Sequence, residues 1–385
     1  MMHVAVVGGG FAGLAAAVRL ARGGARVTLF DPSHPREKPC GGGVTGRALE
    51  LVRDGIDRAA FPFAVIRSAR FIDSRRGESA VVALSEDSRP SLIVSSRASF
   101  DAALVDAARR AGATLESVRV ANVEVGPGGI HVATARGTHG ADVVIGADGA
   151  NSLVRRRVAR PFPRRHISIA TGFFAHGPTS EEIVIELVAD PAGYLWSFPR
   201  PDHLAIGICA EADAGHTAGA LRARAGDWTR RAGLADGARL EPYSWPIPTL
   251  DARAFRALDL AAPRWALAGD AAGLVDPITR EGIYFALVSG QWAAEAILAG
   301  RFPADYAARV RDEIAPELAY AARFKSTFFR RSFIGLFMQA LRRSEAVRHI
   351  MVDLVAGCQS YRALKWRLFK TLELRFAWRM LAGSG

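Results

Sequence analysis

The residues with the clearest chemical meaning lie within 269–287, directly after an apolar run at 265–268 that predicts a short buried strand. Asp270 stands at the end of that strand, where its carboxylate could accept hydrogen bonds from ribityl hydroxyls. A helix is expected to begin here, so the amides of Gly282 and Ile283 would be free and lie at the positive end of its dipole. That end suits the negative N1–C2=O edge of a reduced flavin. Alone, the stretch is equally typical of a small-residue turn between a core strand and a core helix.

The N-terminus supplies a second part of a nucleotide site. Residues 4–7 form an apolar strand that runs into a G-x-G-x-x-G pattern. In this pattern Gly8 permits a tight turn, Gly10 lets a pyrophosphate approach the backbone, and Gly13 lets helix and strand pack closely. The next strand ends at Asp31, where an acidic side chain suits the ribose hydroxyls. Strand, helix, second strand and acid in register predict a dinucleotide site.

Weaker features distinguish FAD from NAD. An apolar strand within 142–152 closes on a turn at Asp148, and Arg97 opens a helix from which it could reach a phosphate or the flavin edge. The strand near Val120 would pass the adenine and offer it backbone contacts. Arg36 would either contact a cofactor phosphate or face the solvent. Each of these features is common in proteins without a nucleotide, so they count only in combination.

The composition is that of a globular protein with a large core. The chain has 385 residues, of which 50% are hydrophobic and 23% charged, enough for two closely joined domains. It contains no run of about 18 apolar residues, so no membrane-spanning helix is expected. The N-terminus is expected to be a strand rather than a signal peptide. Three cysteines far apart in sequence predict neither a disulfide framework nor a metal site, which fits a reducing cytoplasm.

The positive charge is concentrated near the C-terminus. The net charge is +12, and from Arg323 onward there are 13 Lys and Arg residues against 3 Asp and Glu. Apolar residues recur there every four positions, at Leu364, Leu368, Leu372 and Phe376. Two interpretations stay open: packed helices with a solvated basic face, or an interfacial helix on an anionic membrane. Nucleic-acid binding is disfavoured, because it would leave the flavin site unexplained.

In combination these features resemble a known fold. Residues 8–13, Arg97, 146–149 and 269–270 resemble, in this order and spacing, the glutathione-reductase-like FAD proteins of the para-hydroxybenzoate hydroxylase type. Within that fold, about residues 1–320 are similar to the geranylgeranyl reductase family. Three stretches carry this narrower likeness: the cysteine and glycines at 40–43, the Y-x-W-x-F-P motif at 194–199, and the loop at 276–283.

The resemblance implies non-covalently bound FAD and an α/β fold. We expect a Rossmann FAD-binding domain of the glutathione-reductase-like kind, an inserted β-sheet substrate domain, and a C-terminal basic helical region. Their expected bounds are 1–160 with 250–302, 161–249, and 303–385, respectively. Residues 166–210 independently support the insertion, because they cluster as several strands with little helical period. A helix at 218–232 and a proline-punctuated return at 242–248 are expected to follow.

The site residues follow from the motifs. The predicted FAD contacts are Gly8, Gly10, Phe11, Ala12, Gly13, Asp31, Arg36, Cys40, Arg97, Val120, Asp148, Gly269, Asp270, Pro277, Gly282 and Ile283. The predicted substrate contacts are Gly42, Gly43, Tyr194, Trp196 and Phe198, the three aromatic residues sharing one face of a strand. Alternating aromatic residues on a strand are also typical of a plain core.

Cys40 and Arg280 are the predicted catalytic residues. Cys40 would position substrate or flavin, or donate a proton; a small buried thiol without function is the alternative. Arg280 stands where the family usually has glycine. Its guanidinium could stabilise the anionic reduced flavin, point away and pair with a carboxylate, or narrow the site for a different substrate.

The resemblance implies a reductase that saturates carbon–carbon double bonds of a prenyl, isoprenoid or similar apolar substrate. Reduced flavin N5 would transfer a hydride over roughly 3–3.5 Å in a site that excludes water and supplies a proton. The alternative is an FAD-dependent monooxygenase acting on an apolar or aromatic substrate through a flavin hydroperoxide. A non-redox use of reduced flavin also stays open. A halogenase is disfavoured, because residues 39–324 contain no lysine.

The expected partners follow from this chemistry. The substrate would be a small apolar, prenyl-like molecule. Electrons would come from NAD(P)H or a ferredoxin-like protein, since no second dinucleotide fingerprint appears. We expect a cytoplasmic protein, with peripheral attachment to the inner face of the membrane as an alternative for the basic region.

Overall fold

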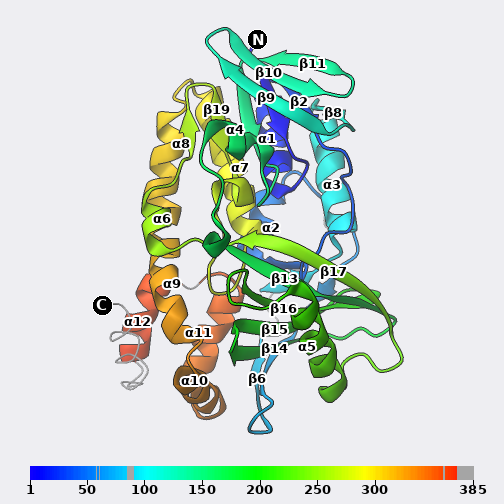
Figure 1. The fold of residues 1–385 in the computed structure, drawn as a ribbon, viewed down its shortest axis with the longest axis vertical. Helices are drawn as coiled ribbons and strands as arrows, with labels where there is room; N and C mark the ends of the chain where they lie inside the picture. Colours follow the sequence, from blue (N-terminus) through cyan, green and yellow to red (C-terminus); the bar gives the residue numbers. More distant parts are fainter. Residues whose placement is uncertain (58, 60, 85–90, 359, 371–385) are drawn as a thin grey trace.

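The computed structural model describes residues 1–57, 59, 61–84, 91–358 and 360–370. Figure 1 shows three parts: a nucleotide-binding sheet with its helices, a second and larger sheet, and a group of C-terminal helices beside the second sheet. Within this part of the chain, no helix has both the length and the apolar character needed to cross a bilayer. The α/β class predicted from the sequence is confirmed.

The nucleotide-binding sheet has six strands, in the order β18-β19-β12-β1-β2-β8. All neighbours pair in parallel except β18, which is antiparallel to β19. Its central strands β1 and β12 read as continuous apolar runs because the sheet is covered by other elements, among them α1 on β1 and β2, and β10 and β11 on β12 and β1. The bounds are β1 His3–Val7, β2 Arg26–Phe30, β8 Thr114–Glu116, β12 Val143–Gly146, β18 Ala261–Ala262 and β19 Trp265–Leu267.

The helices α1 (Phe11–Arg22) and α7 (Ile283–Leu298) pack against each other beside this sheet. The close approach depends on Gly290 of α7, because a Cβ there would lie 2.1 Å from the carbonyl oxygen of Ala12. Helix α3 (Arg97–Arg110) contacts α1, and the antiparallel strands β9 to β11 form a separate sheet of three. Those strands are β9 Val120–Gly126, β10 Gly129–Thr134 and β11 Gly137–Ala141.

The second sheet has seven strands, in the order β17-β13-β16-β15-β14-β5-β6. Four of them confirm the strands expected within 166–210: β13 Ile167–His176, β14 Glu182–Ala189, β15 Ala192–Pro199 and β16 His203–Glu211. Strands β5 (Ser68–Asp73) and β6 (Glu78–Ala83) come from inside the segment expected to belong to the FAD-binding domain. Helix α5 (Ala218–Arg231), also expected, packs on β13 and β16.

The proline-containing return at 242–248 forms most of a strand, β17 (Arg239–Pro248). This strand pairs with β13 on one side and stands at the edge of the sheet. Prolines are tolerated there because an edge strand leaves half of its amides without a sheet partner.

Shorter elements connect the two sheets. Strands β3, β7 and β4 form a small antiparallel sheet, whose first strand directly follows the glycines after Cys40. The bounds of these elements are β3 Gly43–Thr45, α2 Gly46–Val52, β4 Ala64–Val65, β7 Leu92–Val94, α4 Leu153–Val158, η2 Arg164–His166, α6 Ala252–Arg256 and η3 Gly269–Ala272.

The C-terminal helices pack their apolar faces against the second sheet (Figure 1). In α10, Phe333, Phe337 and Leu341 are buried at helical spacing, whereas Arg342 and Arg343 are exposed. The described part therefore matches the interpretation as packed helices with a solvated basic face. The elements are α8 Ala304–Arg309, the π-helix η4 Val310–Ile314, α9 Ala315–Phe328, α10 Arg331–Arg343, α11 Glu345–Val355 and α12 Tyr361–Lys370.

Of the four apolar positions expected on one helix face, Leu364 is buried. Leu372 and Phe376 lie outside the described residues, as does the side chain of Leu368.

Candidate active site

A cavity of about 510 Å³ lies where the three parts of the molecule meet. One side is formed by the glycine loop after β1 and by the start of α7, and another by the aromatic face of β15. The third side comes from the C-terminal helices, through residues such as Leu318, Phe328 and Met351. This third wall was not expected from the sequence, which offered no link between those helices and the motifs.

The glycine loop has the shape that a pyrophosphate needs. A Cβ on Gly8, which has φ +105°, would lie 2.4 Å from the carbonyl oxygen of Ala147, and one on Gly13 would lie 1.9 Å from that of Gly8. A Cβ on Gly10, by contrast, would meet nothing within 4 Å. Two glycines are thus required by packing, while the third faces open space at the N-terminus of α1. That pattern fits a phosphate held by free helix amides.

Asp31 lies at the end of β2, as predicted, and supports this loop. Its carboxylate accepts hydrogen bonds from the backbone N–H groups of Gly9, Ser33 and His34, each at 2.8 Å. Burial opposes ionisation, but contacts with His34 and the loop amides outweigh it and hold the pKa of Asp31 well below its ordinary range. The carboxylate therefore stays charged beside the glycine loop.

Arg97 is buried, with 4% of its surface exposed, and lines the cavity. Its Nε and Nη2 donate to the two carboxylate oxygens of Asp101 at 2.9 and 2.8 Å, and its guanidinium lies 4.0 Å from the ring centre of Phe11. Burial lowers the pKa of Arg97, but the charge of Asp101 more than compensates and raises it overall. The ion pair holds the guanidinium in one orientation at the cavity wall.

His34 and Asp101 were missed by the sequence reasoning. The Nδ1 atom of His34 lies 3.0 Å from Asp31 and its Nε2 lies 3.3 Å from Asp101, so the ring connects the glycine loop to α3. Despite burial, these two carboxylates raise the pKa of His34. The i, i+4 spacing of Arg97 and Asp101 on one helix was an available signal for that pair, whereas nothing in the sequence indicated His34.

Asp148, Val120 and Arg36 are among the predicted FAD contacts that do not line the cavity. The carboxylate of Asp148 accepts hydrogen bonds from Ser152 and from the amide of Leu153, so it caps α4, and burial raises its pKa. Val120 lies in β9, and Arg36 donates to Ser33 at 3.0 Å. Whether they contact the cofactor stays a prediction.

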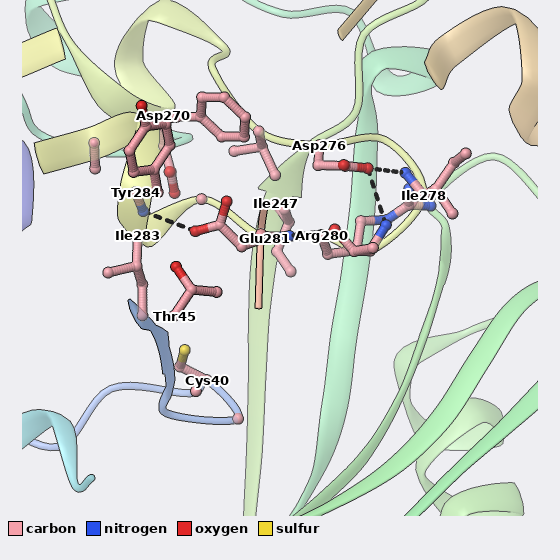
Figure 2. Close-up of a pocket in the computed structure, with 18 of the residues that line it drawn as sticks. Cys40, Thr45, Ile247, Asp270, Asp276, Ile278, Arg280, Glu281, Ile283 and Tyr284 are labelled. Atoms are coloured by element: carbon pink, nitrogen blue, oxygen red, sulfur yellow. Dashed lines mark hydrogen bonds between the residues drawn. The ribbon is translucent and has the colours of Figure 1, made fainter. Parts of the chain in front are cut away.

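The start of α7 is held open toward the cavity. The helix begins at Ile283, and Gly282, at its N-cap, provides no side chain to cap the free amides. Glu281 accepts a hydrogen bond from the amide of Tyr284 at 2.7 Å (Figure 2). The same carboxylate pairs with Arg47 at 3.2 Å. Burial raises the pKa of Glu281, although Arg47 and that amide counteract it. Gly282 and Ile283 thus line the cavity together with Asp270.

Gly269 and Pro277 belong to the same region, and their contact with the cofactor stays a prediction. The amide of Gly269 donates to Ser289 of α7 at 2.9 Å, which ties the end of β19 to that helix. Pro277 lies in the loop between η3 and α7.

The cysteine loop borders the cavity next to the start of α7 (Figure 2). The amide of Gly42 donates to the Sγ atom of Cys40 at 3.3 Å, and Gly42 has φ +82° with no room for a Cβ, which would lie 2.3 Å from the carbonyl oxygen of Ser95. The Nη2 of Arg200 donates to the carbonyl oxygen of Cys40 at 2.7 Å. Cys40, Gly42 and Gly43 all face the cavity.

Arg200 is the residue whose importance the sequence did not indicate. It is fully buried, and its Nη1 lies 2.5 Å from the carboxylate of Glu37. Arg200 thereby links Glu37, just before the cysteine loop, to the carbonyl of Cys40 within it, although Arg200 and Glu37 are 163 positions apart. Arg200 directly follows the Y-x-W-x-F-P motif, but no spacing rule connects it to Cys40.

The aromatic residues of β15 share one face and line the cavity, as strand alternation requires. The Tyr194 hydroxyl donates to the carbonyl oxygen of Thr279 at 2.5 Å, and burial raises its pKa well above the ordinary value. Phe198 packs on the cysteine loop, so closely that a Cβ on Gly43 would lie 3.1 Å from its ring. Trp196 is buried between them.

Two further charged residues, Lys38 and Arg280, line the cavity. The Nζ of Lys38 lies 5.3 Å from the ring centre of Trp245, and burial lowers the pKa of Lys38. Arg280 has φ +59° and 9% of its surface exposed. A lysine is therefore present at the cavity even though residues 39–324 contain none.

Comparison with known proteins identifies the family to which the chain belongs. Residues 1–287 match the model of the FAD binding domain family. The chain is 30% identical to the chloroplastic geranylgeranyl diphosphate reductase of Nicotiana tabacum over 92% of this chain and 78% of that protein.

Solved structures share the fold. A geranylgeranyl bacteriochlorophyll reductase-like protein from Thermoplasma acidophilum superimposes with a TM-score of 0.79 at 22% identity, covering 96% of this chain and all of that one. The flavin-dependent brominase Bmp2 superimposes with a TM-score of 0.71 at 19% identity, covering 97% and 99%. The fold alone therefore does not separate reduction from halogenation. The sequence match does identify the family: the chain belongs to the FAD-dependent oxidoreductases of the geranylgeranyl reductase family.

Proposed function

We propose that this chain is a reductase that saturates carbon–carbon double bonds of a prenyl or similarly apolar substrate. The observation that carries the proposal is the composition of the cavity. The part of its wall formed by β15 and the C-terminal helices is mostly aromatic and aliphatic, with Tyr194, Trp196, Phe198 and Leu318 among its residues. A relative named geranylgeranyl diphosphate reductase, matched over most of its length, supports the same substrate class.

FAD, when bound and reduced, would supply a hydride to the substrate. The glycine loop and Arg97 would hold its phosphates, and the amides of Gly282 and Ile283 would face its negatively charged edge. The aromatic face of β15 would press the substrate chain toward that edge and exclude water from it. These roles match what transfer to an unactivated double bond requires: close approach and a dry site.

The second carbon of the double bond needs a proton, and we assign its delivery to Cys40. The thiol lies on the cavity-lining loop next to the start of α7, and Gly42 and Arg200 hold the loop in place. A thiol is only a weak hydrogen-bond donor, so it can lie in an apolar wall at a low cost in free energy. The electron donor would be NAD(P)H or a ferredoxin-like protein.

The test is a single turnover without oxygen. The FAD-loaded protein is reduced with dithionite under argon and mixed with geranylgeranyl diphosphate, and the product is analysed by mass spectrometry. The expected product has gained two hydrogens per saturated bond and no oxygen atom. A product that forms only when oxygen is admitted, and that carries an oxygen atom, would overturn the reductase proposal in favour of a monooxygenase.

A further inference from the structure

Arg280 has a backbone conformation that is rare for its residue type. Among the described residues it is the only one other than glycine with a positive φ, +59°. The loop imposes this conformation: the Asp276 carboxylate accepts from the amides of Ile278 and Thr279 at 2.7 and 3.0 Å, and the Arg280 amide donates to the Asp276 carbonyl at 3.0 Å. Glycine would adopt the same φ without strain. An arginine therefore stands at a position where the backbone conformation favours glycine.

The guanidinium of Arg280 is buried at the cavity wall. Its Nε and Nη1 atoms have no hydrogen-bond acceptor among the described residues. The other two arginines that line the cavity do have carboxylate partners: Arg97 pairs with Asp101, and Arg47 with Glu281. A guanidinium stays charged at any physiological pH, so burying it unpaired is costly. A ligand that brings an anionic oxygen into the cavity would remove that cost.

The neighbours of Arg280 place its charge on the substrate side of the cavity. The positive charge lowers the pKa of Tyr194 on β15 and of Asp276, in both cases against the larger effect of burial. Figure 2 shows Arg280 beside Asp276 and Ile278, apart from Ile283 and Cys40. The amides that suit the flavin edge are those of Gly282 and Ile283, at the start of α7. The guanidinium is therefore not needed to complete that cradle.

We propose that Arg280 recognises an anionic oxygen group, a phosphate or a carboxylate, carried by the apolar substrate. The planar fork of a guanidinium matches both groups and can bind either with two parallel hydrogen bonds. The apolar walls would hold the attached chain. The inference rests on the proposed function in that it assumes an apolar substrate in this cavity, and it defines the other end of that substrate.

The test compares three ligands that share one chain: geranylgeranyl diphosphate, geranylgeranoic acid and the neutral alcohol geranylgeraniol. Their affinities for the FAD-loaded full chain are measured by equilibrium dialysis. The wild type is expected to bind at least one of the two anions roughly tenfold or more tightly than the alcohol, the scale of a charged hydrogen bond. Which anion is preferred distinguishes a phosphate from a carboxylate.

Variants then assign the preference to one side chain. Arg280→Gln should remove the preference for the anion and leave alcohol binding unchanged, and Arg280→Gly should do the same with no loss in thermal stability. Arg256→Gln removes the same charge from an exposed position on α6 and should keep the preference. The dissociation constant for FAD should not change in either Arg280 variant.

Several results would overturn the inference. Equal affinity of the wild type for all three ligands, including no measurable binding, would do so, as would an anion preference that survives in Arg280→Gln. A weaker affinity for FAD in Arg280→Gln with the anion preference intact would assign the side chain to the cofactor instead. Anion-selective binding without double-bond reduction in the anaerobic assay would leave this inference standing and overturn the proposed function alone.

Discussion

Gly10 and Gly13 differ in why they must be glycine, and a pair of alanine substitutions separates the two reasons. At Gly13 an added Cβ would lie 1.9 Å from the Gly8 oxygen, about 1 Å closer than the 3.0 Å below which real Cβ contacts are essentially absent. Because the Gly8 oxygen belongs to packed backbone and cannot move aside cheaply, Gly13→Ala should lower the free energy of unfolding by about 3 kcal/mol or more. At Gly10 the added methyl meets no protein atom within 4 Å.

Gly10→Ala should therefore keep the fold and impair the cofactor site. Gly10 has φ −81° and ψ −175°, an extended conformation that alanine adopts, so stability should stay within about 1 kcal/mol of the wild type. The methyl would occupy the space at the start of α1 that a pyrophosphate needs. We expect FAD affinity to fall by about ten- to hundredfold, the scale of one or two lost charge-assisted hydrogen bonds.

The assays are urea unfolding of the cofactor-free chain, followed by tryptophan fluorescence, and titration with FAD. Gly13→Ala serves as the matched control, because it adds the same methyl group three residues further along, in the first turn of α1. If Gly10→Ala bound FAD as tightly as the wild type while remaining folded, the assignment of this loop to the pyrophosphate would be refuted.

Three further predictions concern single side chains. Arg200→Gln should lower the free energy of unfolding by about 3 kcal/mol in urea, because it leaves the Glu37 carboxylate and the Cys40 carbonyl without their buried partner. Cys40→Ala should slow anaerobic product formation at least tenfold without changing FAD affinity, if the thiol delivers the proton. His34→Gln should flatten the pH dependence of stability. Folding raises the pKa of His34, so its protonated form stabilises the wild type fully below its ordinary value of 6.5, and this contribution is lost as the pH rises further.

Each of these predictions has its own control. For Arg200, the double variant with Glu37→Gln should be more stable than the sum of the two single effects implies, since removing both charges leaves no carboxylate that has lost its guanidinium partner. Cys40→Ser should recover part of the lost rate, because a hydroxyl can also donate a proton. For His34, the carboxylate of Asp31 acts in the opposite pH range: its lowered pKa contributes stability that is lost only as the pH falls below 3.8. A stability profile between pH 6 and 8 that is the same in wild type and His34→Gln would contradict the prediction.

The elements that the sequence predicted are those whose signals are local. The strands of the second sheet were predictable because apolar residues cluster along them, and the glycine loop because its spacing encodes one turn. Asp148 shows the limit of such signals. An Asp-Gly turn after a strand suits a cofactor site and a helix cap equally well, and here the carboxylate caps α4.

The environment of Arg280 illustrates the same limit. The sequence showed that an arginine replaces the family's usual glycine, but not what surrounds it. Its burial and the missing acceptors depend on how β15 and the loop before α7 come together, whereas hydrogen bonds within the loop itself set the left-handed φ.

By itself, the sequence determined the family, the cofactor and the aromatic face, because each rests on motifs whose own residues lie within a few positions of one another. Only the tertiary structure decided how the cavity is closed. Arg200 and Glu37 meet across 163 positions to hold the cysteine loop, and the helices after residue 303 supply a wall of the site. Burial and charge pairing arise between distant segments, and no local spacing encodes which distant segments will meet.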